Sequence, residues 1–292
     1  MRDPIAVKSN VLFSLRDTLR DERFLEVTTP VARRADLGSG RRAAVDLDGG
    51  RFLRAMIGPA LRANLEYHPR VFEIGPCFRP EKPDAVHGPE FTMLDLYAVG
   101  ESFEFLFELA ERLVAPHIGY ELERISIADY VRDVLGTDPR HEPLGDLPTR
   151  MASRLGVSAD TPFQTVLGQF VERELETQSV GRAVFLTDYL VGGDEPCARL
   201  TPGTTGLINR FEVIVDGLEV VHGYEDETDG ALFAERAQAV DLYDAEQQLA
   251  WELINAGRVP AASVGLGMGV ERLCMAATGV HDIRYFLQSP EF

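Results

Sequence analysis

The sequence has no long hydrophobic run, few cysteines and a shortage of basic residues. No stretch of about 18 apolar residues occurs, which excludes a typical transmembrane helix. Residues 1–17 lack a long apolar run and a small-residue cleavage site, so we expect no signal peptide. The three cysteines, Cys77, Cys197 and Cys274, lie far apart. An odd, scattered set is typical of reduced thiols in a cytoplasm and disfavours a disulfide framework or a zinc site.

Basic residues are too few to balance the acidic ones. The chain has 29 Lys and Arg against 47 Asp and Glu, which leaves a formal net charge of −18. A strongly acidic surface repels phosphate backbones, so the charge weakens the case for a nucleic-acid partner. A local basic patch remains compatible with an acidic total. The simpler interpretation is that the charge keeps the protein soluble.

At 292 residues, 45% of them hydrophobic, the chain can form one large domain or two ordinary ones. Helical spacing and stop signals predict helices at 8–24, 102–115, 231–257 and the end of 263–279. Strand patterns cover 24–30, 70–78 with a break by a bulge or bend near Gly75-Pro76, 91–99, 183–191, 208–224 and the start of 263–279. We interpret 31–50 as loop and 125–178 as an insertion of helix and loop within a single domain, 1–292. Antiparallel strands with helices outside them indicate an α+β fold, not a doubly wound one.

Residues 77–97, CFRPEKPDAVHGPEFTMLDLY, begin and end like β-strands but carry a highly charged tip. Because strand side chains alternate, those of Phe91, Met93, Asp95 and Tyr97 are predicted to share one face. An acid on such a face needs a partner. The alternative is an ordinary hairpin with a solvated loop.

A second hairpin is predicted at 210–229, where Asp-Gly at 216–217 separates two β-branched runs. A regular register from this turn pairs Glu212 with Val221 and places Glu212 and Glu219 on one face, diagonally. Two such carboxylates can hold one divalent ion that carries a polyphosphate. The alternative is an exposed face that is acidic by chance.

The third stretch is GLGMGVERL at 265–273, where alternate glycines let a ligand or a strand approach the backbone closely. Arg272 falls at the start of the next helix, where its guanidinium can reach a phosphate. The spacing matches neither the dinucleotide-binding fingerprint nor the P-loop, so it supports neither site.

Together these stretches resemble the class II aminoacyl-tRNA synthetases of the lysyl, aspartyl and asparaginyl subgroup. FEIGPCFRPE…HGPEFTMLDLY resembles motif 2, GLGMGVERL resembles motif 3, and FLEVTTP after an amphipathic helix resembles motif 1. Within the subgroup the sequence is most similar to lysyl-tRNA synthetase and its short paralogue, the ligase that attaches β-lysine to elongation factor P. The resemblance covers roughly residues 10–100 and 180–290. It implies an antiparallel sheet flanked by helices and a homodimer formed through the motif 1 helix.

The resemblance also implies roles for individual residues. Arg79 and Arg272 would be catalytic, and the two acids Glu212 and Glu219 would hold Mg²⁺. The implied ATP-binding set is Arg79, Glu81, His87, Phe91, Gly269 and Arg272. The implied chemistry is attack of an amino-acid carboxylate on the α-phosphorus of ATP, with cations neutralising the developing charge and no protein nucleophile.

The amino-acid pocket departs from the pattern of the lysine enzymes. Its implied residues are Asp95, Tyr97, His222, Tyr224, Asp226 and Gly267. Asp stands at two places where these enzymes have Glu, so we expect a different or longer basic amino acid. His222 replaces an Asn, and Ala60 stands near the place of the Glu that usually binds the α-amino group. These changes leave room for a β-amino acid.

The acceptor is predicted from what the family pattern lacks here. The motif 1 helix begins about ten residues in, so we expect no N-terminal anticodon-binding barrel before it. We therefore expect a cytoplasmic enzyme that passes an activated amino acid to a protein, such as elongation factor P, or to a small molecule. Two alternatives stay open: a minimal synthetase acting on tRNA, and a non-catalytic regulatory paralogue.

Overall fold

The structure is a computed structural model in which the chain forms two compact units. Unit 1 comprises Met1–Tyr120 and Tyr243–Phe292, and unit 2 comprises Glu121–Leu242. The residues described are 3–34, 45–47, 49–80, 82–193, 195, 197–240, 245–260 and 262–287. Among them, no helix combines the length and the apolar character needed to span a membrane. The secondary structure confirms the predicted α+β class, with a large, mainly antiparallel sheet and outer helices.

Helix α1, Pro4–Asp21, opens unit 1. It begins earlier than the predicted 8–24 because Asp3 caps it: the Asp3 carboxylate accepts a hydrogen bond from the Ile5 N–H at 2.9 Å, and Pro4 occupies the first turn. Beyond its end Arg23 has a φ of 63°, a left-handed conformation that turns the chain towards the first strand.

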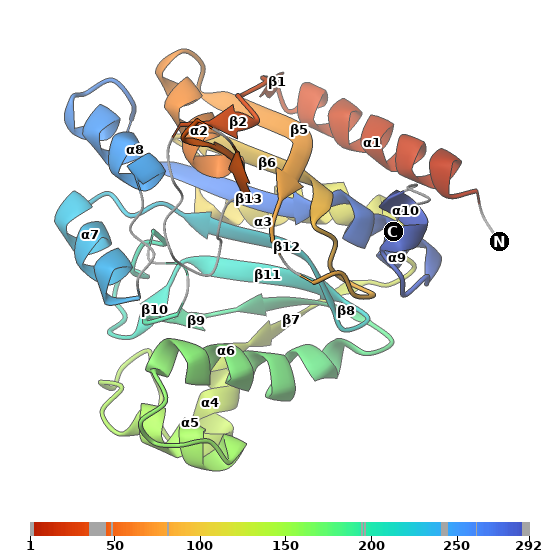
Figure 1. The fold of residues 1–292 in the computed structure, drawn as a ribbon. Helices are drawn as coiled ribbons and strands as arrows, with labels where there is room; N and C mark the ends of the chain where they lie inside the picture. Colours follow the sequence, from red (N-terminus) through yellow and green to blue (C-terminus); the bar gives the residue numbers. More distant parts are fainter. Residues whose placement is uncertain are drawn as a thin grey trace. The chain divides into compact units, whose positions relative to one another are not determined.

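Four strands of unit 1 lie in the order β1-β5-β6-β13. Figure 1 shows β13, from the C-terminal part of the chain, beside β6. The β1–β5 pair is parallel, whereas β5–β6 and β6–β13 are antiparallel. The bounds are Leu25–Glu26 for β1, Arg70–Phe78 for β5, Glu90–Val99 for β6 and Ser263–Gly269 for β13.

The break predicted in this strand near Gly75-Pro76 is wrong, because no bulge interrupts its pairing with β6. The register of β5 against β6 runs without a shift from Arg70 to Phe78, through Gly75 and Pro76. A proline is tolerated because β1 pairs with β5 near Val71, so residue 76 lies beyond that pairing on the outer side of β5.

The loop predicted over 31–50 is also partly wrong, since short strands occur at its two ends. These are β2, Ala32–Arg33, and β3, Val45–Leu47, which pair with β4, Arg51–Leu53. Residues 35–44 and 48 lie outside the described residues. The remaining elements of unit 1 are α2 Gly58–Arg62, η1 Ala63–Glu66, α3 Phe103–Val114, η2 Ala115–His117, α8 Ala245–Asn255, α9 Val270–Thr278 and α10 Arg284–Leu287.

Unit 2 has four main strands in the order β12-β11-β8-β7. The strand predicted over 183–191 is divided because Asp188 adopts a left-handed φ of 58°. The bounds are Leu122–Ser126 for β7, Ala183–Thr187 for β8, Tyr189–Leu190 for β9, Leu207–Ile208 for β10, Arg210–Val215 for β11 and Leu218–Glu225 for β12.

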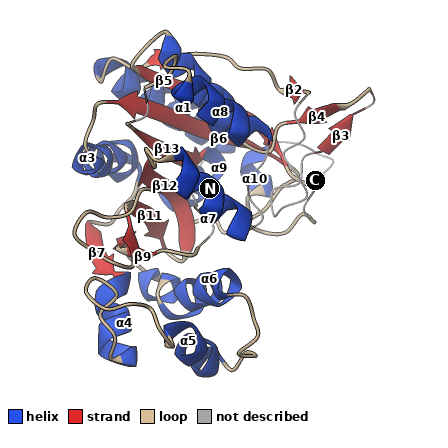
Figure 2. Cartoon of the chain, turned by 90° about the vertical axis from the view of Figure 1, so that its left-hand side faces the viewer, coloured by secondary structure: helices blue, strands red, loops and turns tan. Residues whose placement is uncertain are grey.

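The predicted insertion, 125–178, is largely helical and lies within unit 2. Its helices are α4 Ile127–Leu135, α5 Leu147–Leu155, α6 Phe163–Glu174 and the short η3 Glu176–Ser179. Figure 2 shows α4, α5 and α6 grouped together, and their buried faces share a core that includes Val131, Met151 and Phe170. This core also takes Leu186 and Ile214 from the strands, so the helices fold onto the sheet of their own unit.

The single helix predicted over 231–257 is wrong. Helix α7 spans Gly230–Ala239 and ends at Val240, whose φ of −111° and ψ of 10° are not helical. Helix α8 then forms separately, and residues 241–244 lie outside the described part. The predicted stop at Gly257 is confirmed by its φ of 70°.

Candidate functional site

In unit 1 the candidate site is built on one face of strand β6. The side chains of Phe91, Met93, Asp95 and Tyr97 project from this face, as the alternation predicts. On the neighbouring strand β13, three of these residues are paired with glycines: Met93 with Gly269, Asp95 with Gly267 and Tyr97 with Gly265. The predicted motif 2 strand and the predicted glycine-rich strand therefore form one surface, on which β13 contributes no side chains.

The ring of Tyr97 uses the space above one of these glycines. A Cβ added at Gly265 would lie 2.6 Å from Tyr97 Cε1, which is closer than real Cβ contacts. The Tyr97 hydroxyl and the Asp95 carboxylate both point to the start of α2, because a Cβ at Gly58 would lie 3.1 Å from the hydroxyl and 3.7 Å from Asp95 Oδ2. Ala60, near the expected place of the α-amino ligand, belongs to the same short helix. Asp95 and Tyr97 are thus buried and directed at one point.

Arg79 lies over the ring of Phe91, with its guanidinium carbon 5.0 Å from the ring centroid. Its backbone N–H donates to the Pro89 carbonyl at 2.9 Å, which closes the hairpin loop at its base. The contact brings together two of the residues predicted to bind ATP. Glu81, predicted to bind ATP as well, lies outside the described residues.

The tip of this loop is organised by Asp84. Its carboxylate accepts hydrogen bonds at 2.7 Å from the N–H groups of Val86 and His87 and lies 3.0 Å from His87 Nδ1. The His87 hydrogen bond, followed by that of Val86, lowers the pKa of Asp84 to about 2. The Ala85 carbonyl accepts from Ile283 N–H at 2.8 Å. His87 is therefore turned towards its own loop, and the segment before α10 fixes the tip.

A buried charged cluster lies beside Asp95, and the sequence analysis missed it. Glu73, directly opposite Asp95 on β5, accepts a hydrogen bond from Arg54 at 2.6 Å and from the Thr29 hydroxyl at 2.7 Å. The second terminal nitrogen of Arg54, Nη2, is buried and would lie 2.3 Å from a Cβ at Gly75. Glycine at 75 therefore makes room for Arg54. The sequence does contain a signal for this cluster, because Arg54 and Glu73 are each a charged residue within an apolar stretch.

Arg272, at the start of α9, lies against the chain at Gly269. A Cβ at Gly269 would be 3.4 Å from Arg272 Cδ and 3.5 Å from its Cβ and Cγ, which is ordinary van der Waals contact. The preceding residue, Glu271, is 1% exposed and contacts both Lys8 and the Thr92 N–H. The motif 3 segment is thus bound to α1 and to β6.

In unit 2 the hairpin turn is confirmed, but the predicted register is wrong. Asp216 and Gly217 have φ values of 50° and 77°, as a tight hairpin turn requires. A β-bulge then shifts the pairing between Ile214 and Val213, so Glu212 is opposite His222 and not Val221. The bulge also moves His222 to the face of Glu219, where His222 Nδ1 lies 3.7 Å from the carboxylate.

Glu212 and Glu219 still share a face. Glu219 is opposite Ile214, and residues 212 and 214 alternate along β11, so they point to the same side of the sheet. Glu212 is nearly buried, and Arg210 donates to it at 2.5 Å while lying 4.4 Å above the centroid of the Tyr189 ring. Burial, and next the charge of Glu212, raise the pKa of Tyr189 well above its ordinary value. Among the described residues, no group of three or more His, Cys, Asp and Glu could hold a metal.

The last two predicted pocket residues follow His222 along the chain. Tyr224 lies with its ring parallel to that of His222, at 6.2 Å between centroids. Asp226 is 1% exposed and forms an isolated β-bridge with Ala198. Asp226 is thus buried directly after the end of β12, whereas the rings of His222 and Tyr224, within β12, lie parallel to each other.

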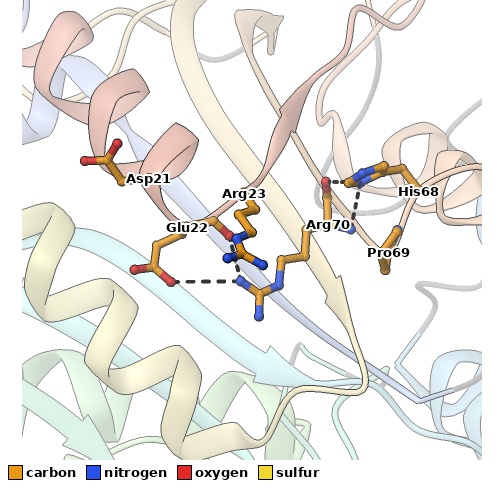
Figure 3. A pocket seen from close by; sticks show the side chains of 6 residues that line it. All are labelled: Asp21, Glu22, Arg23, His68, Pro69 and Arg70. Atoms are coloured by element: carbon orange, nitrogen blue, oxygen red, sulfur yellow. Dashed lines mark hydrogen bonds and ion pairs between the residues drawn. The ribbon is translucent and has the colours of Figure 1, made fainter.

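Unit 1 also has a cavity of about 450 Å³ between the end of α1 and the start of β5. Figure 3 shows Arg70 reaching across it to Glu22, whose carbonyl accepts from Arg70 at 2.6 Å. The second side of the Arg70 guanidinium binds Glu101 at 2.5 Å. None of the predicted site residues lines this cavity, so it is separate from the face of β6.

Comparison with known proteins identifies the family of this chain. A family model described as "tRNA synthetases class II (D, K and N)" matches residues 1–291. The lysine--tRNA ligase of Kineococcus radiotolerans is 31% identical over 96% of this chain and 62% of its own length. Lysine--tRNA ligase 2 of Methanosarcina mazei is 27% identical over 99% of this chain and 62% of its own length. The lysine--tRNA ligase of Oceanobacillus iheyensis is 27% identical over 99% of this chain and 65% of its own length. The chain thus spans less than two thirds of these relatives, and it belongs to the class II tRNA synthetase family of the Asp, Lys and Asn type.

Proposed function

We propose that the protein is a ligase that activates an amino acid with ATP, forming an aminoacyl-adenylate and pyrophosphate. The observation that carries the proposal is the face of β6, where Phe91, Asp95 and Tyr97 stand opposite the glycines of β13. An acid and a phenol buried at one end, and a ring with a guanidinium at the other, suit a ligand that is basic at one end and anionic at the other.

The residues present fit ATP and Mg²⁺. In unit 1 the Arg79 guanidinium at the Phe91 ring offers charge for a phosphate beside a flat surface for a base. Arg272, Gly269, His87 and Glu81 would complete the nucleotide contacts. In unit 2 Glu212 and Glu219 share a face, and Mg²⁺ is commonly held by one or two carboxylates with substrate phosphates filling the remaining positions. Bound Mg²⁺ would neutralise phosphate charge.

In the proposed reaction the substrate carboxylate attacks the α-phosphorus and the bond to pyrophosphate breaks. Arg79 binds the carboxylate and the α-phosphate, so that it brings the reacting atoms together and stabilises the charge that develops. Arg272 holds the outer part of the nucleotide. The amino acid supplies the nucleophile itself, so the chain needs to orient the reactants rather than form a covalent intermediate.

We propose a basic amino acid as the substrate. Asp95 and Tyr97 are 8% and 5% exposed and point to the same place, where a cationic side chain would donate a charge-assisted hydrogen bond to the Asp95 carboxylate. We also propose that Gly267 of unit 1, and His222, Tyr224 and Asp226 of unit 2, bind the amino acid. The relatives named above are lysine--tRNA ligases, which agrees with a basic substrate.

For the acceptor we propose a protein such as elongation factor P, or a small molecule, in place of tRNA. The support is the net charge of −18, which disfavours a phosphate backbone. A tRNA acceptor is the second candidate, and the names of the relatives favour it.

We also propose a homodimer through α1, on which Ile5 and Phe13 are 62% and 65% exposed. Buried Cys77 and Cys274, whose pKa burial raises to about 12, suit the reduced thiols of a cytoplasmic protein.

The first test is ATP–pyrophosphate exchange with Mg²⁺ and lysine, β-lysine, ornithine, arginine, aspartate or asparagine. We expect exchange with one basic compound, and loss of exchange in Arg79→Ala without loss of folding. Arg20→Ala, on the exposed side of α1, is the control. No exchange with any compound would refute adenylation of these substrates, and wild-type exchange by Arg79→Ala would refute the site. Incubating the charged enzyme with tRNA, elongation factor P or small amines then identifies the acceptor.

A further inference from the structure

Glu271 is a buried carboxylate that binds two distant parts of unit 1. Its Oε1 accepts a hydrogen bond from Lys8 Nζ of α1 at 2.7 Å, and its Oε2 accepts from the Thr92 N–H of β6 at 2.9 Å. The Glu271 side chain is 2% exposed and that of Lys8 is 19% exposed. Lys8 also reaches the Phe286 carbonyl of α10 at 3.4 Å. One ion pair therefore joins α1, α9, α10 and β6.

The two ends of this contact adjoin the proposed nucleotide ligands. Thr92 directly follows Phe91, and Glu271 directly precedes Arg272. The register of β6 with β13 ends where Met93 is opposite Gly269, after which the chain turns into α9. At that point the Glu271 carboxylate, and not a strand carbonyl, binds the Thr92 N–H. The carboxylate thus fixes the backbone of β6 to the first turn of α9.

Stability alone is a poor reason to bury this pair. Removing two charges from water costs several kcal/mol, and well-packed apolar residues are often as stable or more so. The groups that face Glu271 are Lys8 and, in the same helix, the Cys274 thiol. Burial, and next the charge of Glu271, raise the pKa of Cys274 to about 12, although the charge of Lys8 acts to lower it. Lys8 is therefore the cation that compensates Glu271, and it comes from an element outside the sheet.

We propose that Glu271, held by Lys8, is a positioning residue that fixes Phe91 relative to Arg272, and that Lys8 thereby links α1 to the ATP site. This inference rests on the proposed function. Weakening the pair releases the Thr92 backbone and the first turn of α9. Phe91 and Arg272 are then displaced from the base and the outer phosphates of ATP. Asp95 and Tyr97, further along β6, keep their positions.

The test compares Lys8→Met, Lys8→Arg and Glu271→Gln with wild type. Arg20→Met is the control, because Arg20 lies on the same helix and its ion pair with Asp17 is exposed. Calorimetry with Mg·ATP measures the nucleotide affinity, and pyrophosphate exchange measures the KM for ATP and the KM for the amino acid. Amide hydrogen exchange at Thr92 reports the contact independently of any ligand.

We expect Lys8→Met to raise the ATP dissociation constant and KM about tenfold, the order for a weakened charge-assisted hydrogen bond. In Lys8→Met the KM for the amino acid should stay within about twofold of wild type, and the Thr92 amide should exchange faster. Lys8→Arg should keep most of the ATP affinity, and Arg20→Met should leave all three quantities unchanged. Glu271→Gln keeps the shape of the side chain and tests the same point if Lys8→Met does not fold.

Four results would overturn the inference. Faster exchange at Thr92 with unchanged ATP affinity would make the pair purely structural. Equal losses for ATP and amino acid, or an equal effect of Arg20→Met, would indicate general loosening. Absence of ATP binding by the wild type would refute the proposed function and the positioning role with it, while exchange at Thr92 would still show whether the contact exists.

Discussion

Replacing Gly265 with alanine tests whether the face of β6 is shaped for its ligand. The added methyl would lie 2.6 Å from Tyr97 Cε1 and 2.9 Å from Cδ1, whereas ordinary contacts begin at 3.4 Å. The ring must therefore move by about 0.8 Å, the difference between 3.4 and 2.6 Å. Tyr97 is 5% exposed, so its surroundings leave little room for this shift.

Two effects should follow. Overpacking of this size costs about 1–3 kcal/mol, and each kcal/mol lowers the Tm by about 2–4 °C in a chain somewhat smaller than this one. The Tyr97 hydroxyl also moves away from the start of α2, and a displacement of about 1 Å can cost about 100-fold in rate. We expect kcat/KM for the amino acid to fall about 10- to 100-fold in pyrophosphate exchange, with the KM for ATP unchanged.

Gly168→Ala in α6 is the matched control, because a Cβ there has nothing within 4 Å and alanine favours a helix. It should leave activity unchanged and raise the Tm slightly. Removing the ring in a Gly265→Ala, Tyr97→Ala double variant should relieve the overpacking but not restore amino-acid binding. A Gly265→Ala protein with wild-type Tm and amino-acid KM would refute the reasoning.

Three further changes test other parts of unit 1. Asp95→Asn should reduce exchange with basic amino acids by about 10- to 100-fold, because a charge-assisted hydrogen bond is lost, and an equal loss for all substrates would make Asp95 structural. Arg54→Met should lower the free energy of unfolding in urea by about 3–5 kcal/mol, since it leaves Glu73 buried without its cation, and a change below about 1 kcal/mol would contradict this. His87→Ala should raise the pKa of Asp84 from about 2 towards 3.8 in an NMR titration. Because that pKa is depressed in the fold, the stabilisation of the loop is complete above pH 3.8 and is lost as the pH falls towards 2, and an unchanged titration would show that His87 is not the cause.

The parts of the fold predicted correctly are those with a strong local pattern. The alternation in β6 correctly placed Phe91, Met93, Asp95 and Tyr97 on one face, and the glycine spacing in β13 correctly indicated a close approach to its backbone. The Asp-Gly turn at 216–217 fixed the start of its hairpin. Predictions failed where a local signal was overridden, as at Gly75-Pro76, which continues a regular strand because residue 76 lies beyond the β1 pairing.

The candidate site was predicted less completely, because its support comes from contacts between distant residues. The bulge at Ile214 and Val213 moves His222 to the face of Glu219, and nothing in the alternation of the sequence marks it. The consecutive residues Val220 and Val221 are both buried, which fits an extra residue in β12.

The sequence by itself determined the family, the order of the motifs and which side chains of β6 point together, because these depend on residue types at short spacing. Only the tertiary structure decided what holds those side chains in place. Arg54 and Glu73 are 19 residues apart, and Lys8 and Glu271 are 263 apart. Periodicity describes neighbours within one element, whereas a buried charge finds its partner wherever the fold brings a compensating group within hydrogen-bond distance.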